Sequence, residues 1–419
     1  MNTFQTIVLG IFGFFILAGL AVLATTKGRG GESQTTLVLW GAANASVIRE
    51  LEESAFPRNL RLAYREISPE LLDTELVEAL ASRRGPDIVL LPLELLLRHQ
   101  DKLLLIPYAN YSERQFKDTF IQAGDLFLTK EGIAALPFSL DPLLMFVNRD
   151  SFDEAGIASP PRFWDEFLLL AGRLTRREES GAIARSAVSL GEYRNISHAK
   201  ELLAALFLQS GNALVSRDEA GAARAALSGS AAQSVLDFYT EFANPTKPLY
   251  AWNRSLPLSR AAFLSSRLAV YFGFGSELQE LRKTNPNLNF DAASLPRPRG
   301  AEVGVTYGKL TGVALLGSTA HPSAALQAAH LLTGAEAAAL VAKRLGLPPA
   351  RRELLQAKPT DAFGGILFDS ALRARGFLDP HPRRSDELLQ TMVESVTSGK
   401  RRSSDALSRA ESELRALLR

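Results

Sequence analysis

Cysteine is absent from all 419 residues of the chain. Its absence excludes disulfide bonds, thiolate metal ligands and a cysteine nucleophile, and it also excludes the residue through which bacterial lipoproteins are anchored. Histidine is scarce as well, and its few copies lack the spacing of metal ligands. The five are His99, His198, His321, His330 and His381. We therefore expect no metal and no other cofactor.

Catalytic motifs are missing too. The chain contains no Walker, zincin, Gly-x-Ser-x-Gly or dinucleotide-binding pattern, each of which would fix a particular geometry around a reacting group. Gly308-Lys309 lacks the earlier glycine and the following Ser or Thr of a phosphate loop. The two carboxylates of a glycoside hydrolase have no fixed sequence spacing, so a hydrolase stays open as an alternative. The sequence favours a protein that is not an enzyme.

No large charge of one sign is present, because 47 basic residues face 45 acidic ones. Such a chain has no strong field to recruit nucleic acid. The basic run Lys400–Arg402 is diluted by Asp405 and Glu411, as on a solvated helix face. With 46% hydrophobic residues, the chain has the composition and length of a well-cored globular protein of two domains.

The N-terminus carries the longest apolar run. Phe4–Ala24 is apolar apart from two residues and is long enough to cross a bilayer core of ~30 Å. A cleaved signal peptide is the alternative, but its apolar region is usually shorter, and no basic segment or small-x-small cleavage site is present. We expect residues 1–24 to be a retained anchor and 25–36, rich in Gly, Ser and Thr, to be a tether. By the positive-inside rule, Lys27 and Arg29 alone would place the chain that follows the span in the cytoplasm. This is the opposite of the extracytoplasmic orientation that we expect.

Strands and helices alternate after the tether. Leu37–Gly41 and Ile88–Leu91 are short apolar runs typical of buried strands, and Asn59–Ile67 alternates like a half-buried strand. Between them, Ser46–Phe56 and Pro69–Ser82 have helical spacing. This order predicts an α/β fold with a parallel sheet.

A different pattern follows Gly132. Two apolar runs, Ile133–Phe138 and Leu143–Val147, flank a polar and proline-containing interruption at Ser139–Pro142, as in a strand that crosses between two lobes. Further helices are predicted at Arg162–Leu174, Ser197–Ser210, Ala220–Ala243, Ser259–Leu264 and Pro322–Leu345, with two more stretches within Ser385–Arg419. Further strands are predicted at Leu268–Phe274, Asn289–Leu295 and Leu310–Leu316.

Several segments together resemble extracellular solute-binding protein family 1, the maltodextrin-binding-like receptors of bacterial ABC importers, and in particular anchored versions from ultrasmall bacteria. The resemblance covers nearly everything after residue 36. Its most specific part is Ile133–Asn148, followed by Asp150–Phe167 with Pro160-Pro161 and Trp164–Phe167. Further matches are Gly85–Ile88, Ala262–Leu264, Leu268–Gly273 and Gly346–Arg352. The missing lipobox cysteine departs from the family and leaves the N-terminal span as the anchor.

The resemblance implies a two-lobed, periplasmic-binding-protein-like fold of type II, with an N-terminal transmembrane helix and three crossings between the lobes. We expect the crossings at Ser139–Pro142, Gly304–Gly312 and Leu345–Ala350. Lobe 1 would then comprise residues 37–139 and 309–345, and lobe 2 residues 140–308 and 346–419. The ligand would lie in the cleft between the lobes, which close as a hinge.

Aromatic residues near strand ends are the first candidates for ligand contacts, because sugar rings stack their C–H faces on aromatic rings. The predicted site comprises Trp40, Asn44, Asp141, Trp252, Tyr271, Phe272, Ser276 and Tyr307. Each aromatic residue has the alternative of packing in the core. Asp141 would accept hydrogen bonds from ligand hydroxyls, or else cap a turn. Asn44 and Ser276 are included for their loop positions and hydrogen-bonding capacity.

The expected protein is a single-pass, membrane-anchored receptor whose body lies on the extracytoplasmic side. Its partners would be a small ligand, a sugar or oligosaccharide, and the permease subunits of an ABC importer. Within the same fold, a cleft richer in carboxylates than in aromatics would favour a peptide, polyamine or amino-sugar ligand. A surface glycan hydrolase and an adhesion module without a ligand site are the alternatives of other classes.

Overall fold

The structure is a computed structural model and describes residues 34–218 and 221–418. The strands are β1 (Thr35–Gly41), β2 (Leu60–Glu66), β3 (Ile88–Pro92), β4 (Leu103–Leu104), β5 (Leu136–Asn148), β6 (Arg176–Arg177), β7 (Ile183–Val188), β8 (Val215–Arg217), β9 (Ala223–Ala225), β10 (Leu268–Phe274), β11 (Phe290–Ala293), β12 (Thr306–Leu316) and β13 (Ala374–Arg375). All except β8 and β9 belong to one mixed sheet, whose main order is β2-β1-β3-β12-β5-β10-β7-β6.

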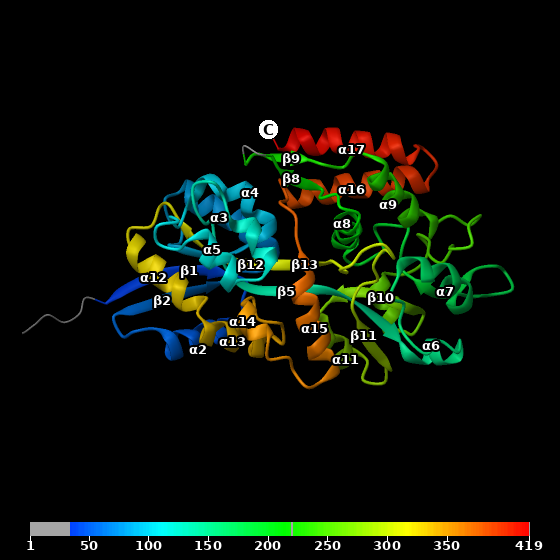
Figure 1. The fold of residues 1–419 in the computed structure, drawn as a ribbon, viewed down its shortest axis with the longest axis horizontal. Coiled ribbons are helices and arrows are strands. Elements are labelled where there is room, and N and C mark those ends of the chain that lie inside the picture. The colour runs from blue at the N-terminus through cyan, green and yellow to red at the C-terminus, as the bar shows by residue number, and fades with distance from the viewer. Residues whose placement is uncertain (1–33, 219–220, 419) are drawn as a thin grey trace, which may run out of the picture.

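Helices cover both faces of this sheet (Figure 1). The α-helices are α2 (Ala45–Ala55), α3 (Pro69–Ala81), α4 (Leu96–His99), α5 (Glu113–Thr119), α6 (Arg149–Glu154), α7 (Phe167–Leu174), α8 (Ala199–Gln209), α9 (Ser230–Glu241), α10 (Ser259–Leu264), α11 (Glu277–Thr284), α12 (Pro322–Leu332), α13 (Ala335–Leu345), α14 (Arg352–Leu355), α15 (Ala362–Arg373), α16 (Pro382–Thr397) and α17 (Ser403–Leu417). Short 3-10 helices are η1 (Leu93–Leu95), η2 (Gln100–Lys102), η3 (Gln122–Phe127) and η4 (Trp164–Glu166).

The first half of the molecule is built on β1, β2 and β3. β1 pairs in parallel with both neighbours, as the alternation of strands and helices predicts. Successive residues of β3 are buried, so both of its faces lie inside the protein, which accounts for its unbroken apolar sequence. The sheet as a whole is not parallel, however, because β12 runs antiparallel to β3 and to β5.

Two long strands join this half to the second. The Leu136–Pro142 part of β5 pairs with β12, and its Leu143–Val147 part pairs with β10. Ser139–Pro142 interrupts the apolar pattern but not the strand, and the predicted strand that crosses between the halves is β5. The strand continues through Pro142, which gives up only an N–H and still accepts a hydrogen bond from the Gly275 amide at 3.0 Å. In Figure 1 β5 and β12 run through the centre of the molecule.

The third link between the halves lies later than predicted. Leu345–Ala350 stays against the first half, where the Ile121 amide donates to the Ala350 carbonyl at 3.1 Å. The chain then passes through α15 to β13, which pairs with the start of β12 at Thr306 and Tyr307. Figure 1 shows α15 below the centre of the sheet and the C-terminal helices α16 and α17 above the second half.

The second half contains one further error of prediction. The helix expected over Ala220–Ala243 begins only at Ser230, and the β8–β9 hairpin precedes it. Gly229, just before the helix, has a φ of 94°, a left-handed conformation that ends the preceding segment. The other predicted helices and strands are present with small shifts of their ends, except that Pro322–Leu345 is two helices, α12 and α13, which Thr333 and Gly334 separate.

The description of the chain begins at residue 34. The predicted anchor, residues 1–24, and the predicted tether, residues 25–36, therefore lie outside the described residues, apart from positions 34–36. Among residues 34–218 and 221–418, no single helix is long and apolar enough to cross a bilayer. α12 and α13 reach that length and hydropathy only as a pair, which is bent by 59°.

Candidate functional site

Polar side chains gather where the two halves meet. They come from η1, which directly follows β3, from the middle of β5, from the first residues of β12, from the first turn of α8, and from the segment between β13 and α16. We call this set the junction cluster. Its members are Glu94, Asp141, Lys200, Glu201, Tyr307, Lys309 and Asp379.

Lys200 and Asp379 form the buried base of the cluster. Lys200 Nζ lies 2.6 Å from Asp379 Oδ2, and the two side chains are 8% and 1% exposed. Asp379 Oδ1 also accepts hydrogen bonds from the Ser385 hydroxyl at 2.6 Å and from the His381 amide. Burial acts to lower the pKa of Lys200, but the Asp379, Glu94 and Glu201 carboxylates outweigh it and raise that pKa. Lys200 therefore keeps its charge, which the Asp379 carboxylate compensates.

Glu94 is different, because it has no hydrogen-bond or ion-pair partner among the described residues. It is half-buried, and burial raises the pKa of its carboxyl group. Glu201 and Asp379 act in the same direction, while Lys200 and Lys309 oppose them without forming a contact. A half-buried carboxylate without a partner is costly to keep in a folded protein, which is typical of a group reserved for a ligand.

Tyr307 provides a second group without a partner, within electrostatic range of Glu94. Its side chain is 5% exposed, and its ring packs against Phe274 and Phe377. Its hydroxyl has no partner among the described residues. Burial raises the pKa of Tyr307 well above its usual range, and the Glu201, Glu94 and Asp379 carboxylates add to that effect. The phenol is therefore neutral and can both donate and accept a hydrogen bond.

Asp141 and Lys309 face each other across β5 and β12. Burial raises the pKa of Asp141 to about 6, although the Ser276 amide donates to its Oδ1 at 3.1 Å. Lys309 Nζ lies 4.1 Å from the centre of the Phe274 ring and 3.7 Å from Glu201. Asp141 is thus a hydrogen-bond acceptor whose ionisation is easily changed near neutral pH.

A satisfied network borders the cluster. Glu277 accepts from the Tyr271 hydroxyl and from the Phe274 amide, at 2.7 and 2.8 Å, and contacts His198 Nε2 at 2.7 Å. Burial alone would raise the pKa of Glu277, but these contacts lower it. His198 takes a left-handed φ of 59° at the start of α8, and its ring packs on Phe274 at 4.8 Å. The network fixes the ends of β10 and α8 beside the cluster.

Three predicted site residues, Asp141, Ser276 and Tyr307, lie in or beside the cluster. Tyr271 is fully buried, and its hydroxyl is held by Glu277, as described above. Phe272 is 1% exposed and packs against Trp164 at 5.8 Å. These two rings offer no free face to a ligand in this structure.

The other predicted residues lie elsewhere. Trp40 is 6% exposed and is covered by the Arg65 guanidinium, 4.7 Å from its ring centre. Asn44 caps α2, where its side chain accepts from the Ser46 amide. Trp252 is completely buried, and its Nε1 donates to Asn195 Oδ1 at 3.0 Å. Neither Trp40 nor Trp252 contacts a member of the junction cluster in the interactions that the structure records.

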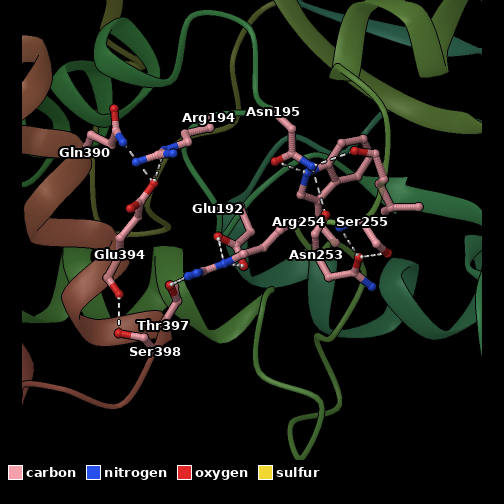
Figure 2. A network of polar contacts seen from close by, with 12 residues as sticks. Glu192, Arg194, Asn195, Asn253, Arg254, Ser255, Gln390, Glu394, Thr397 and Ser398 are labelled. Atoms are coloured by element: carbon pink, nitrogen blue, oxygen red, sulfur yellow. Dashed lines mark hydrogen bonds and ion pairs between the residues drawn. The ribbon is translucent and has the colours of Figure 1, made fainter.

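Figure 2 shows the polar network around Asn195. The Asn195 amide donates to the carbonyls of Asn253 and Leu256 at 2.8 and 3.0 Å, so its hydrogen bonds are used in holding the loop that carries Trp252. The neighbouring Arg254 contacts Glu192 at 3.2 Å and reaches Thr397 of α16. The network explains why Trp252 belongs to the framework of the second half.

The sequence prediction missed five members of the cluster, which are Glu94, Lys200, Glu201, Lys309 and Asp379. Glu94 follows the apolar run of β3 by two residues, so its position at a strand end was a usable signal. Lys200 and Asp379 are 179 positions apart in the chain, and no spacing joins them. Within residues 34–218 and 221–418, no group of three or more His, Asp or Glu side chains is arranged to hold a metal ion.

The family of bacterial extracellular solute-binding proteins matches residues 73–339, well over half of the chain. Among curated proteins, a protein of Brucella abortus (strain 2308) named as a binding protein is 24% identical over 166 residues. That match covers 38% of this chain and 40% of the relative, so the chain spans less than half the length of the relative that it matches.

Solved structures share the fold over nearly the whole chain. The sugar-binding protein MalE from Xanthomonas citri superposes with a TM-score of 0.73 at 20% identity, covering 92% of this chain and 97% of that one. A substrate-binding protein of Listeria monocytogenes in complex with cycloalternan gives 0.69 at 17% identity, with 91% and 98% covered. The cyclic alpha-maltosyl-1,6-maltose binding protein from Arthrobacter globiformis gives 0.73 at 16% identity, with 92% and 99% covered.

The fold is thus of the mixed α/β, periplasmic-binding-protein-like type that the sequence predicts. The matched segment contains β3, both long central strands and most of the junction cluster. The chain belongs to the family of bacterial extracellular solute-binding proteins.

Proposed function

We propose that the chain is an extracytoplasmic receptor that captures a sugar or oligosaccharide at the junction cluster and delivers it to an ABC importer. The observation that carries this proposal is the pair of unsatisfied groups, Glu94 and the Tyr307 hydroxyl, between the two halves of a solute-binding fold. Similar folds from Xanthomonas, Listeria and Arthrobacter are described as binding sugars or in complex with one. Family membership favours this receptor over a glycan hydrolase.

Capture would use the two halves as lobes that close on the ligand. We propose lobes of residues 37–139 with 309–355 and of residues 140–308 with 374–419, hinged on β5, β12 and the later link through α15. Glu94 belongs to the first lobe and Glu201 and Asp379 to the second, so a ligand touching both sides would favour the closed form. The apolar segment 1–24 would hold the receptor at the membrane next to its permease.

Ligand binding should raise the thermal stability of the purified full-length chain. A ligand present at 100 times its Kd stabilises a protein by about 2.7 kcal/mol, so unfolding temperatures should rise saturably with one class among mono- and oligosaccharides, amino acids, peptides and polyamines. Chromatography of each sugar after incubation checks that it is recovered intact. A shift only with amino acids or peptides contradicts sugar binding, and cleavage of a glycan contradicts the receptor.

Replacing Tyr307 by Phe should weaken ligand binding without weakening the fold. The hydroxyl has no partner in the protein, so its loss should leave the unfolding temperature nearly unchanged, while the lost ligand hydrogen bond should raise Kd roughly threefold to tenfold. Isothermal titration of the ligand found in the panel measures this change.

Tyr239 provides the matched control for Tyr307. Its buried hydroxyl donates to the Glu192 carbonyl at 2.7 Å, so Tyr239→Phe should lower stability by about 1 kcal/mol and leave Kd unchanged. If Tyr307→Phe behaves like Tyr239→Phe, the Tyr307 hydroxyl is structural and does not contact the ligand.

The ionised Asp141 carboxylate should lower the stability of the fold at neutral pH, because the side chain lies in a poorly solvated position. Burial raises its folded-state pKa from 3.8 to about 6, so the protonated form adds stability that is complete below pH 3.8 and is lost as the pH rises through 6. At pH 7 the free energy of unfolding is therefore lower than at pH values below 3.8 by at most about 3 kcal/mol on account of this carboxyl group. Asp141→Asn, which keeps an acceptor for Ser276, should therefore be more stable than the unmodified chain at pH 7.

Denaturant titrations at pH 7, 5 and 4 measure this difference. The advantage of Asp141→Asn should shrink steadily as the pH falls. The exposed Asp118→Asn, which makes the same charge change, should show no such trend. An advantage for Asp141→Asn that is constant across the three pH values would contradict the raised pKa.

A further inference from the structure

The junction cluster has more carboxylates than cations to pair with them. Glu94, Asp141, Glu201 and Asp379 contribute four carboxyl groups, and Lys200 and Lys309 contribute two amines. This imbalance lies between the two halves, where we propose that the ligand binds. A ligand cation would supply a positive charge that the cluster itself lacks.

Neither lysine is free to neutralise Glu94. Lys200 is bound to Asp379 at 2.6 Å and donates to the Pro382 carbonyl at 3.2 Å. Lys309 lies over the Phe274 ring and within 3.7 Å of Glu201. Both amines influence Glu94 only through space, and neither forms an ion pair with it.

Tyr307 gives a second and independent sign that a ligand group belongs here. Its side chain is about 95% buried, and its hydroxyl has no partner among the described residues although Glu94, Glu201 and Asp379 lie around it. The hydroxyl oxygen itself keeps some access to solvent, so it is open to a ligand. Here an acceptor or donor on the ligand would complete its hydrogen bonding, beside the unpaired carboxylate.

A neutral sugar would leave the charge problem unsolved. Closing the two halves over Glu94 removes water from its carboxylate, and a hydroxyl group compensates a buried negative charge less well than a cation does. The rings expected to stack on a sugar give little help, because Trp252, Tyr271 and Phe272 are at most 1% exposed. Charge and hydrogen bonds are what the junction cluster offers a ligand.

We infer that the ligand carries a protonated amine that pairs with the Glu94 carboxylate next to the Tyr307 hydroxyl, so that the receptor takes an amino sugar or an oligomer of one. The inference rests on the proposed function, because it names the class of sugar that binds at the same site. Asp141, the other carboxylate without an ion-pair partner, would accept a hydrogen bond from a ligand hydroxyl.

Matched ligands test this inference. Glucosamine, galactosamine and mannosamine differ from glucose, galactose and mannose in one ammonium group in place of a hydroxyl. The disaccharide of glucosamine differs from cellobiose in two such groups, one in each sugar unit. Isothermal titration of the full-length chain with each pair should give at least one amine that binds tenfold or more tightly than its neutral counterpart. N-acetylation of that amine should remove the preference, because it removes the charge.

Glu94→Gln should bring the affinity ratio of the two members of the pair close to one, since it keeps the shape and removes the charge. The control Glu70→Gln lies at an exposed position of α3 and should leave the ratio unchanged. A preference that survives Glu94→Gln, or neutral sugars that bind as tightly as the amines or more so, would overturn the inference while leaving the sugar receptor intact. If neither amines nor neutral mono- and oligosaccharides bind, the proposed function fails and this inference fails with it.

Discussion

The pairing of β5 with β12 is the constraint on which the rest of the structure depends. Both strands are long enough to pass from one half to the other, and their backbone groups must stay paired along the whole crossing. Gly308 permits the close approach, because a Cβ there would lie 2.6 Å from Leu140 Cδ1. Asp141, Tyr307 and Lys309 are carried on this rigid pair, so their positions follow from the sheet and not from a loop.

The electrostatics of the junction follow from the same arrangement. Lys200 and Asp379 lie at the base of the cluster and compensate each other, which allows two charges to stay in a nearly dry place. Glu94 stands across the junction without such a partner. A protein that needed only stability would remove or pair this carboxylate, so the uncompensated charge is best explained by a ligand that binds there and supplies the partner.

The sequence predicts the framework well and the site only in part. Runs such as Ile88–Leu91 and Leu268–Phe274 are strands because apolar side chains must be buried on both faces, which is a local property that can be read directly. The aromatic residues misled the site prediction, since Trp252 and Phe272 serve the core equally well by chemistry alone. Lys200 and Asp379 meet only through the fold, and no local pattern indicates that one is the partner of the other.

The most direct test of the account is a crystal structure of the full-length chain with its tightest ligand from the sugar and amino-sugar panel. The account predicts ligand density between the two halves, with a ligand nitrogen within about 3 Å of a Glu94 carboxylate oxygen and a ligand oxygen or nitrogen at hydrogen-bond distance from the Tyr307 hydroxyl. Density for the ligand elsewhere on the molecule, with Glu94 and Tyr307 as unpartnered as before, would contradict it.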